Sequence, residues 1–456
     1  MAAAAARRRG IGALGWVVVA LLVLFGAQVV YQKFYANHPR FTPDEGLIAE
    51  LAAAEIEEEP PPSPASGWPQ WRGLRRDGVA HEPDLLMAWP RSGPPKVWEI
   101  PGGEGYSAFA VAGGRAYSML QQNDRQAVVC WNAADGKELW RAPLEGAYSK
   151  QFAGPRSTPT LDGDRLYAVS AGGQFACLTA DTGHVLWKHD LLAEFHAANL
   201  EWGIAGSPLV DGDLVFVNPG GPNGHSVAAF HKSDGRLAWK ALDDPAGYSS
   251  PVALTASGVR QVVFFTGAGA VGVAAADGKL LWRFPWLTDY GVNAATPLTF
   301  KARKGDEVLD YVFISSGYGK GCALVKIEGD GKVGFRARRV YEGNQMCNHF
   351  ASPVRYHDHF YGLNEAKLTC MDVRTGQVKW ERSGFQKGSL LRVDGYLLVL
   401  GEYGKLALME ATPEEPPDIA SASPLGRRRC WTMPALADGK LYLRDETKVL
   451  CLKVRK

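Results

Sequence analysis

The sequence predicts an all-β protein, an eight-bladed β-propeller of four-stranded antiparallel blades, preceded by an N-terminal transmembrane helix. Three features predict it. The first is a recurring short motif, a turn pair followed by Trp, and the second is a Ser-Pro or Thr-Pro pair at a constant position in each repeat. The third is one long apolar run near the start of the chain. The motif recurs with a period in the forties, which is typical of repeat architectures in which each unit is one small sheet.

The recurring motif is Asp-Gly or Thr-Gly, three residues, and then Trp. Gly takes the positive φ that a tight hairpin turn needs, so the Trp should sit at one fixed point on the strand leaving the turn. The fifth unit is irregular, with Phe335 where Trp is expected, and the outer strand of the seventh is expected through residues 413–417. The complete copies end at Trp140, Trp187, Trp239, Trp282 and Trp380.

The Pro step marks where each unit begins. It precedes an apolar run, a turn and a second apolar run, so each unit should contain four short strands. Counting the starts of the innermost strands gives eight units. The steps are Thr158-Pro159, Ser207-Pro208, Ser250-Pro251, Thr296-Pro297 and Ser352-Pro353, with Met433-Pro434 as a variant.

The two ends of the repeat region complete one another. Residues 96–100 have the pattern of a last strand without its first three, and residues 430–453 supply three strands without a last. A closed ring, in which the early strand completes the final blade, leaves no sheet edge unpaired. The propeller is therefore predicted over residues 67–456, with Trp68 and Trp71 at its opening expected to plug or clasp the propeller edge.

The first 66 residues predict a membrane anchor and a stalk. Residues 1–10 form a basic tail, and the apolar residues 11–30 are long enough to span a bilayer. The positive-inside rule then predicts a single-pass protein of the inner (cytoplasmic) membrane, with its propeller in the periplasm or at the cell exterior. A cleaved signal peptide is the alternative. Residues 31–66 are predicted to be a stalk with a short helix, either a solvated spacer or a contact for a partner or the membrane surface.

Composition narrows the function. A net charge of +2 gives no indication of nucleic-acid binding. The seven cysteines include no adjacent pair and no CxxC, which favours small buried strand residues over a disulfide framework or a metal site. No catalytic residue and no metal ligand set is predicted.

The repeat resembles that of the PQQ-like (pyrroloquinoline-quinone) β-propeller family over about residues 68–456. That family includes quinoprotein alcohol dehydrogenases and the propeller lipoprotein of bacterial outer-membrane assembly. The dehydrogenases use a vicinal Cys pair, a Ca²⁺ ion and an Asp base, and this sequence has no adjacent cysteines and no acidic cluster with Ca²⁺-ligand spacing. It also has no haem-binding extension.

The resemblance leaves two functions open. One is a non-catalytic scaffold, without cofactor, that binds an envelope protein or peptide. The other is a PQQ-dependent oxidoreductase, or a binder of PQQ or of a small anion or sugar, using Arg156, Lys387 and Trp431.

A ligand site is expected at the mouth of the central funnel. Aromatic rings could stack on a ligand, and cations could clamp a carboxylate. In the alternative interpretation the rings only plug the funnel and the cations are solvated at its rim. The candidate residues are Tyr106, Arg156, Trp202, Tyr248, Asn293, Asn348, His349, Lys387, Arg429 and Trp431.

Overall fold

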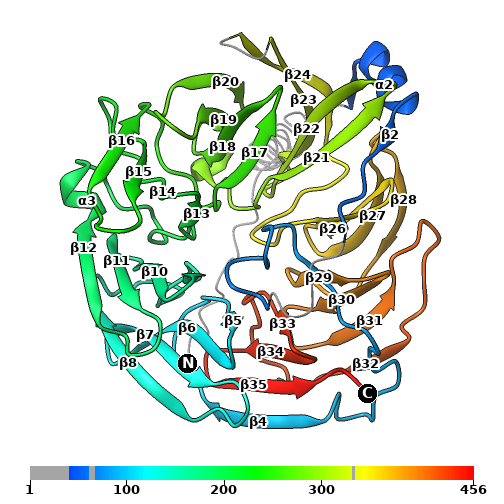
Figure 1. Cartoon of the computed structure of the whole chain (residues 1–456). Helices are drawn as coiled ribbons and strands as arrows, with labels where there is room; N and C mark the ends of the chain where they lie inside the picture. The colour runs from blue at the N-terminus through cyan, green and yellow to red at the C-terminus, as the bar shows by residue number, and fades with distance from the viewer. Residues whose placement is uncertain (1–40, 61–66, 331–333) are drawn as a thin grey trace, which may run out of the picture.

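The computed structural model describes residues 41–60, 67–330 and 334–456, and shows eight sheets around one axis (Figure 1). The predicted eight-bladed propeller is confirmed. The predicted basic tail and transmembrane span, residues 1–30, lie outside the described residues. Within the described ranges, no helix has the length and apolar character needed to cross a bilayer.

The first four blades follow the chain in order. Blade 1 contains β5 (Ala110–Ala112), β6 (Arg115–Gln122), β7 (Arg125–Asn132) and β8 (Glu138–Leu144). Blade 2 contains β9 (Thr160–Asp162), β10 (Arg165–Val169), β11 (Gln174–Thr179) and β12 (Val185–Asp190), after which comes helix α3 (Leu191–Glu194). Blade 3 contains β13 (Leu209–Asp211), β14 (Leu214–Val217), β15 (Val227–His231) and β16 (Leu237–Ala241). Blade 4 contains β17 (Val252–Ala256), β18 (Val259–Thr266), β19 (Gly269–Ala274) and β20 (Leu280–Pro285).

The last four blades include two with added strands. Blade 5 contains β21 (Leu298–Lys304), β22 (Glu307–Ser316), β23 (Gly321–Gly329) and β24 (Phe335–Gly343). Blade 6 contains β25 (Val354–Tyr356), β26 (His359–Asn364), β27 (Lys367–Asp372) and β28 (Val378–Arg382). Blade 7 contains β29 (Ser389–Val393), β30 (Tyr396–Leu400), β31 (Leu406–Glu410) and β32 (Ala420–Ala422), with β3 (Val79–Ala80) added in parallel to β29. Blade 8 contains β33 (Ala435–Ala437), β34 (Lys440–Arg444), β35 (Lys448–Lys453) and β4 (Lys96–Pro101).

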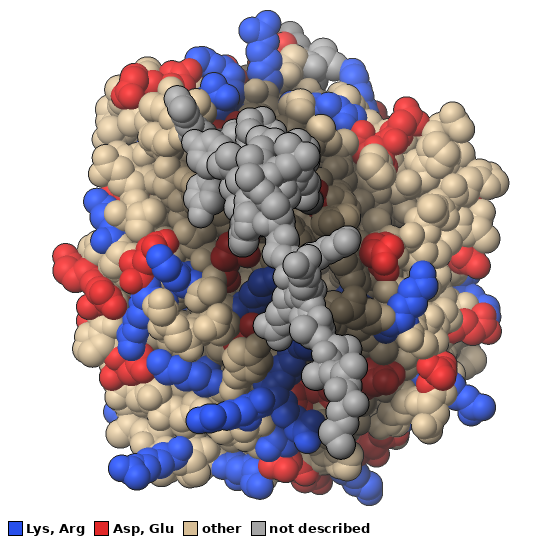
Figure 2. Space-filling model, turned by 180° about the vertical axis from the view of Figure 1, so that it is seen from behind, with Lys and Arg blue, Asp and Glu red and all other residues tan. Residues whose placement is uncertain are grey.

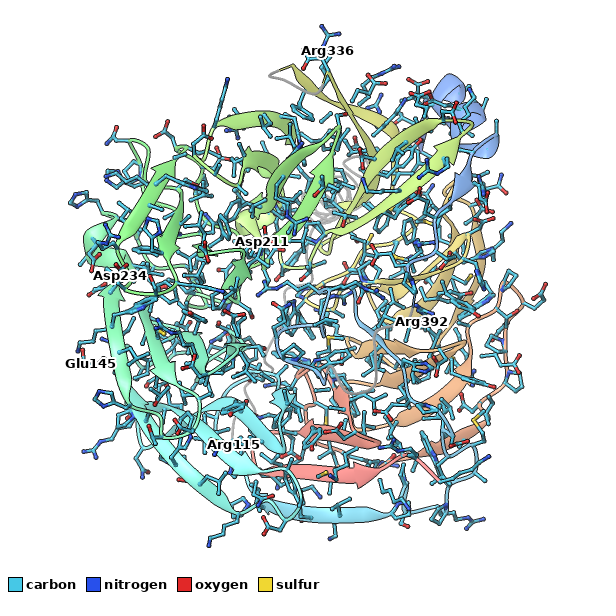
Figure 3. The ribbon with its side chains drawn as sticks, viewed as in Figure 1. Arg115, Glu145, Asp211, Asp234, Arg336 and Arg392 are labelled. Carbon is cyan, nitrogen blue, oxygen red and sulfur yellow. The ribbon has the colours of Figure 1, made fainter. Side chains whose placement is uncertain are left out.

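The burial of each strand follows from its place in a blade. The middle strands are covered on both faces by neighbouring blades, so they are almost continuously apolar; in β22 the last eight residues are all buried. The outer strands face solvent and carry charges. In Figure 3, Glu145 and Asp234 lie at the outer edge of the ring, and both are exposed.

The ring closes as predicted. β4 pairs antiparallel with β35, and Trp98 lies opposite Cys451. The early strand is therefore the outer strand of the last blade, and the two ends of the propeller share one sheet (Figure 1).

An aromatic ring joins most blades to the next, an arrangement that we call the turn latch. Trp98 covers Gly136 in the turn of blade 1, and its indole N–H donates to the Ala133 carbonyl at 3.2 Å. The same pair of contacts recurs for Trp140 with Gly183 and Ala180, Trp187 with Gly235 and Lys232, and Trp239 with Gly278 and Ala275.

The fifth blade uses tyrosine for its latch, which corrects the prediction of Phe335. Tyr341 pairs with Leu324, next to a β-bulge between β23 and β24, and each latch Trp occupies the equivalent position beside a bulge in its own blade. The Tyr341 hydroxyl donates to the Val373 carbonyl at 3.0 Å. Its ring lies against Gly376. The prediction failed because the β23–β24 hairpin extends further than the others, so the turn no longer marks the position of the latch.

The outer strand of the seventh blade was also predicted in the wrong place. It is β32, which pairs with β31, while residues 413–417 lie in the connection before it. Three of these residues are prolines, which have no N–H to donate to a sheet.

Residues 41–60 cover the fifth blade, where a stalk was expected. β1 (Thr42–Pro43) extends its outer edge, helix α2 (Glu45–Ala52) crosses over, and β2 (Glu55–Ile56) extends its inner edge. Asp44 caps the helix by accepting from the Leu47 N–H at 3.1 Å. Leu47 and Leu51 are buried against the blade, so this segment belongs to the propeller and is not a free spacer.

The turn latch predicts a difference between two glycines that both have positive φ. Gly136→Ala would place a Cβ 2.7 Å from the Trp98 ring, whereas Gly163→Ala meets nothing within 4 Å. Both replacements should cost about 1 kcal/mol of backbone strain. Gly136→Ala should cost about 1–3 kcal/mol more, because the ring must move. Urea unfolding measures the difference, and equal losses for the two variants would contradict the latch.

Candidate functional site: the central cavity

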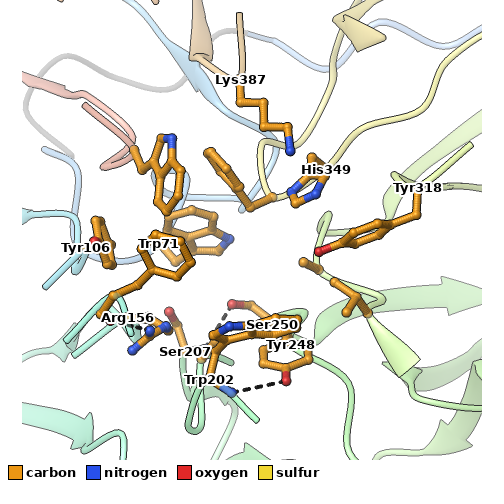
Figure 4. Close-up of a pocket in the computed structure, with 16 residues that line it drawn as sticks. Trp71, Tyr106, Arg156, Trp202, Ser207, Tyr248, Ser250, Tyr318, His349 and Lys387 are labelled. Atoms are coloured by element: carbon orange, nitrogen blue, oxygen red, sulfur yellow. Dashed lines mark hydrogen bonds between the residues drawn. The ribbon is translucent and has the colours of Figure 1, made fainter. Parts of the chain in front are cut away.

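A cavity of about 280 Å³ lies on the propeller axis (Figure 4). The strands of each blade alternate in direction, so the blade-to-blade connections all lie on one face of the ring, and the cavity opens among them. Every blade contributes one residue to the lining. It lies three positions before the Pro of the Ser-Pro or Thr-Pro step, or before the equivalent position where Pro is absent. These residues are Tyr106, Arg156, Ala205, Tyr248, Ala294, Phe350, Lys387 and Trp431.

The floor of the cavity comes from the segment that enters the propeller. Trp68 pairs with Val111 through its backbone, and Trp71 lines the cavity while its indole N–H donates to Thr296 Oγ1 at 2.8 Å. The pair of tryptophans was predicted to plug or clasp the propeller edge, whereas Trp71 lines the cavity on the axis.

Two buried arginines fill the axis from the same segment. Arg72 donates to the Ser352 carbonyl at 3.1 Å, and Arg76 donates to the Ser207 and Pro251 carbonyls at 3.1 and 3.0 Å. Burial lowers the pKa of Arg72 to about 10 and of Arg76 to about 9, so both remain charged at neutral pH. Sequence reasoning missed them, although their signal was present: two arginines four residues apart in a segment without strand periodicity.

One side of the cavity is aromatic. The Trp431 ring lies 5.4 Å from Tyr106, 4.9 Å from Phe152 and 5.1 Å from Phe350, measured between ring centroids. Further round the ring, Trp202 lies 5.7 Å from Tyr248, and the Trp202 backbone N–H donates to the Tyr248 hydroxyl. We call this set, which comes from the segments that lead into blades 8, 1, 2, 3, 4 and 6, the aromatic wall.

Arg156 lies within the aromatic wall. Its guanidinium stands 4.7 Å from the Tyr148 ring centroid, and it donates to the Gly154 and Phe152 carbonyls. Burial lowers its pKa. No carboxylate of the described chain forms an ion pair with it, so the charge is held by rings and carbonyls alone.

The opposite side carries polar groups from three consecutive blades, Tyr318, His349 and Lys387, which we call the polar wall (Figure 4). The His349 ring lies 4.5 Å from that of Tyr318, and its Nε2 is buried without a hydrogen-bond partner in the described chain. Burial and the nearby Lys387 lower the pKa of His349 to about 4. Lys387 Nζ has no carboxylate partner in the same ranges.

The cavity lining is cationic and aromatic, and none of its described residues is acidic. Two carboxylates stand behind it as structural acceptors: Glu402 accepts from the Trp431 indole at 3.0 Å, and Glu446 from the Tyr106 hydroxyl at 2.8 Å. The lining can therefore bind an aromatic or anionic group, and no side chain in it is placed as a carboxylate base.

Most of the candidate residues from the sequence meet in this cavity. Those that line it are Tyr106, Arg156, Trp202, Tyr248, His349, Lys387 and Trp431. Asn293 and Asn348 are instead fully buried in the blades, where their amides donate to the Thr266 and Leu363 carbonyls. Arg429 is exposed at the rim, 4.5 Å from the Trp431 ring centroid.

Five of the seven cysteines lie in strands, as predicted, whereas Cys347 and Cys430 lie in the connections that lead to β25 and β33. All seven are buried and unpaired, and burial raises the pKa of the thiols, to about 12 for Cys130. Over residues 41–60, 67–330 and 334–456, no three His, Cys, Asp or Glu side chains are grouped to hold a metal ion.

Comparison with known proteins gives a family match and several relatives. A sequence profile described as outer membrane protein assembly factor BamB matches residues 63–153 and 148–382. BamB of Yersinia pestis is 26% identical over 238 residues, which cover 49% of this chain and 56% of that protein. The quinohemoprotein alcohol dehydrogenase ADH IIB of Pseudomonas putida is 29% identical over 131 residues, 27% of this chain and 18% of that protein.

A solved structure agrees on the fold. The quinohemoprotein alcohol dehydrogenase ADHIIG of Pseudomonas putida HK5 superposes with a TM-score of 0.62 at 11% identity, covering 86% of this chain and 80% of that one. At this identity the likeness shows the propeller fold alone. The chain spans only about half, or less, of the length of the two curated relatives.

The buried ring of His349 predicts a loss of stability in acid. Its pKa is lowered from 6.5 to about 4 in the folded protein, so between these values the unfolded chain takes up a proton that the folded one does not. Stability should therefore fall as the pH drops from about 6.5 to about 4, by on the order of 2 kcal/mol from this group. His349→Gln should remove that part of the decline in urea unfolding.

The matched control is His184→Gln, which changes an exposed histidine on the turn of blade 2. It should keep the wild-type pH slope. If His349→Gln kept that slope too, the environment assigned to His349 would be incorrect.

Proposed function

The chain belongs to the PQQ-like β-propeller family of outer membrane protein assembly factor BamB, and on that premise we propose that it is a non-catalytic scaffold of the cell envelope. Its propeller binds a protein partner on the face that carries the cavity mouth. Residues 11–30 anchor it in the inner membrane, with the propeller in the periplasm or at the cell exterior.

The observation that carries this proposal is the chemistry of the cavity lining. It offers stacking surfaces and cations but no acidic side chain in the described chain. The hydroxyls of Ser207 and Ser250 are occupied as acceptors of the Thr158 and Ser207 backbone N–H groups, both at 2.9 Å. The groups that line the cavity therefore support binding of a partner over catalysis, because no nucleophile with an adjacent base lies among them.

The loops of the same face support a protein partner. Leu287 and Tyr290 are 71% and 76% exposed, the largest values among the exposed large apolar side chains of the described chain, and Tyr403 is 56% exposed. Exposed aromatic and aliphatic side chains on a rigid scaffold are typical of interaction surfaces. Figure 2, seen from behind the view of Figure 1, shows acidic and basic side chains interspersed over that face of the molecule.

The alternative is binding of PQQ, which the dehydrogenase relative favours. The aromatic wall, Arg156 and Lys387 fit a planar anion, so these residues would hold the group. The lining does not fit a dehydrogenase centre, because it offers no carboxylate for a divalent cation or for proton abstraction.

A photo-crosslinking experiment tests the scaffold. A benzoylphenylalanine at Leu287 in the full-length chain in cells should give a discrete adduct with one envelope protein, because this side chain projects from the cavity face. The same group at Lys137, exposed on the turn of blade 1 at the opposite face, is the control and should not give it. Identical patterns from both positions, or no adduct at Leu287, would count against the scaffold.

Titration with PQQ tests the alternative. The purified full-length chain should show no stoichiometric uptake of the chromophore by absorbance after desalting, with or without Ca²⁺. Tight 1:1 binding that Lys387→Met abolishes would replace the scaffold with a cofactor-binding role.

A further inference from the structure

We infer that the central cavity captures the C-terminal residue of a protein partner, holding its carboxylate at the polar wall and an aromatic side chain against the aromatic wall. The inference rests on the proposed scaffold function and assigns the chemistry of the contact. It follows from four features of the described residues: the closed floor, the unfilled donors, the size of the cavity and the apolar rim.

The cavity is a dead end. Trp71 closes it, and the guanidinium groups of Arg72 and Arg76 occupy the axis beneath. Both arginines are fully buried and bonded to the carbonyls of the innermost strands. A chain passing through the ring is therefore blocked, and only a chain end or an isolated side chain enters from the mouth.

The polar wall presents donors without acceptors. Lys387 Nζ has no ion pair, the Tyr318 hydroxyl has no hydrogen bond, and His349 Nε2 is buried without a partner, all with respect to the described chain. Figure 4 shows Lys387 and Tyr318 directed into the cavity on either side of His349. A carboxylate would accept from Lys387 and Tyr318, and from His349 in the tautomer that carries its proton on Nε2. Left unpaired, the buried Nε2 is otherwise costly.

The aromatic wall and the volume of the cavity determine which terminal side chain of the partner can bind. A cavity of about 280 Å³ is equivalent to about nine waters at about 30 Å³ each, which suits one large side chain with its terminal carboxylate. Trp202, Tyr248 and Trp71 provide ring faces and edges for offset or edge-to-face contact. Arg156, on the same side, adds a cation beside the guest ring.

The rim accommodates the residues that precede the terminus. Tyr290 makes an edge-on contact with Tyr318, with ring centroids 6.2 Å apart, and the exposed Leu287 lies three residues before it. The apolar surface therefore continues outward from the polar wall. A free amino acid would use the cavity alone, whereas the end of a protein would also use this rim.

Calorimetric titration of the full-length chain in detergent, with octapeptides ending in Phe, tests the inference. The free acid should bind at least about tenfold more tightly than its C-terminal amide, and more tightly than the same peptide ending in Ala. Lys387→Met should reduce the affinity for the acid to that for the amide, while Lys387→Arg retains it. Lys137→Met, which removes a positive charge from the opposite face, should leave both affinities unchanged.

Three outcomes would overturn the inference. The acid and amide could bind equally, or not at all; Lys387→Met could have no effect; or N-acetylphenylalanine could bind as tightly as the peptide while Tyr290→Ala changes nothing, which would indicate a small-molecule site. The crosslinking experiment tests the scaffold function separately from this inference. If the Leu287 crosslink persists with Lys387→Met and with a partner that lacks its C-terminal residue, the scaffold function stands and this inference is wrong.

Discussion

The contact between an outer-strand aromatic ring and the turn of the next blade is the interaction on which the propeller depends. It combines ring burial over a glycine with one N–H or O–H bond to a carbonyl, as Trp98 shows with Gly136 and Ala133. Because the contact runs from one blade to the next in most of the ring, it helps to fix the angle between those blades. It joins blade 8 to blade 1 only because β4 supplies the outer strand of blade 8. Closure of the ring and the turn latch are thus one constraint on the sequence, and this constraint explains the regular spacing of the Gly-x-x-x-Trp motif.

Closure has a consequence at the axis. The innermost strands start at Pro steps, and their carbonyls at the axis have no further strand to bind. Arg72 and Arg76 donate to such carbonyls of blades 3, 4 and 6, since guanidinium offers several donors in a fixed plane. The same segment raises Trp71 beneath the opening. The entering segment therefore closes the central channel and leaves a pocket. That pocket is aromatic on one side and rich in donors on the other, because each blade contributes one residue at the same repeat position.

The sequence predicted the ring and most of the cavity because both follow from one repeat register. Counting back three residues from each Pro step, or from the equivalent position in the two blades without Pro, identifies Tyr106 through Trp431, since equivalent positions in a propeller face the same axis. Where the register broke, prediction failed: the long β23–β24 hairpin moved the latch from Phe335 to Tyr341. Asn293 lies one residue before its register position and Asn348 two residues before its own, and both are buried in the blades. Trp71, Arg72 and Arg76 lie outside any repeat, and only the folded chain brings them to the axis.

The propeller depends on a closed ring with a filled axis, and hydrogen exchange of the full-length chain measures both together. If β4 and residues 68–80 are integral to the propeller, their amides should exchange as slowly as those of β22, through global unfolding. Exchange of either segment within seconds, while β22 remains protected, would show an open ring or an empty axis and would contradict the account.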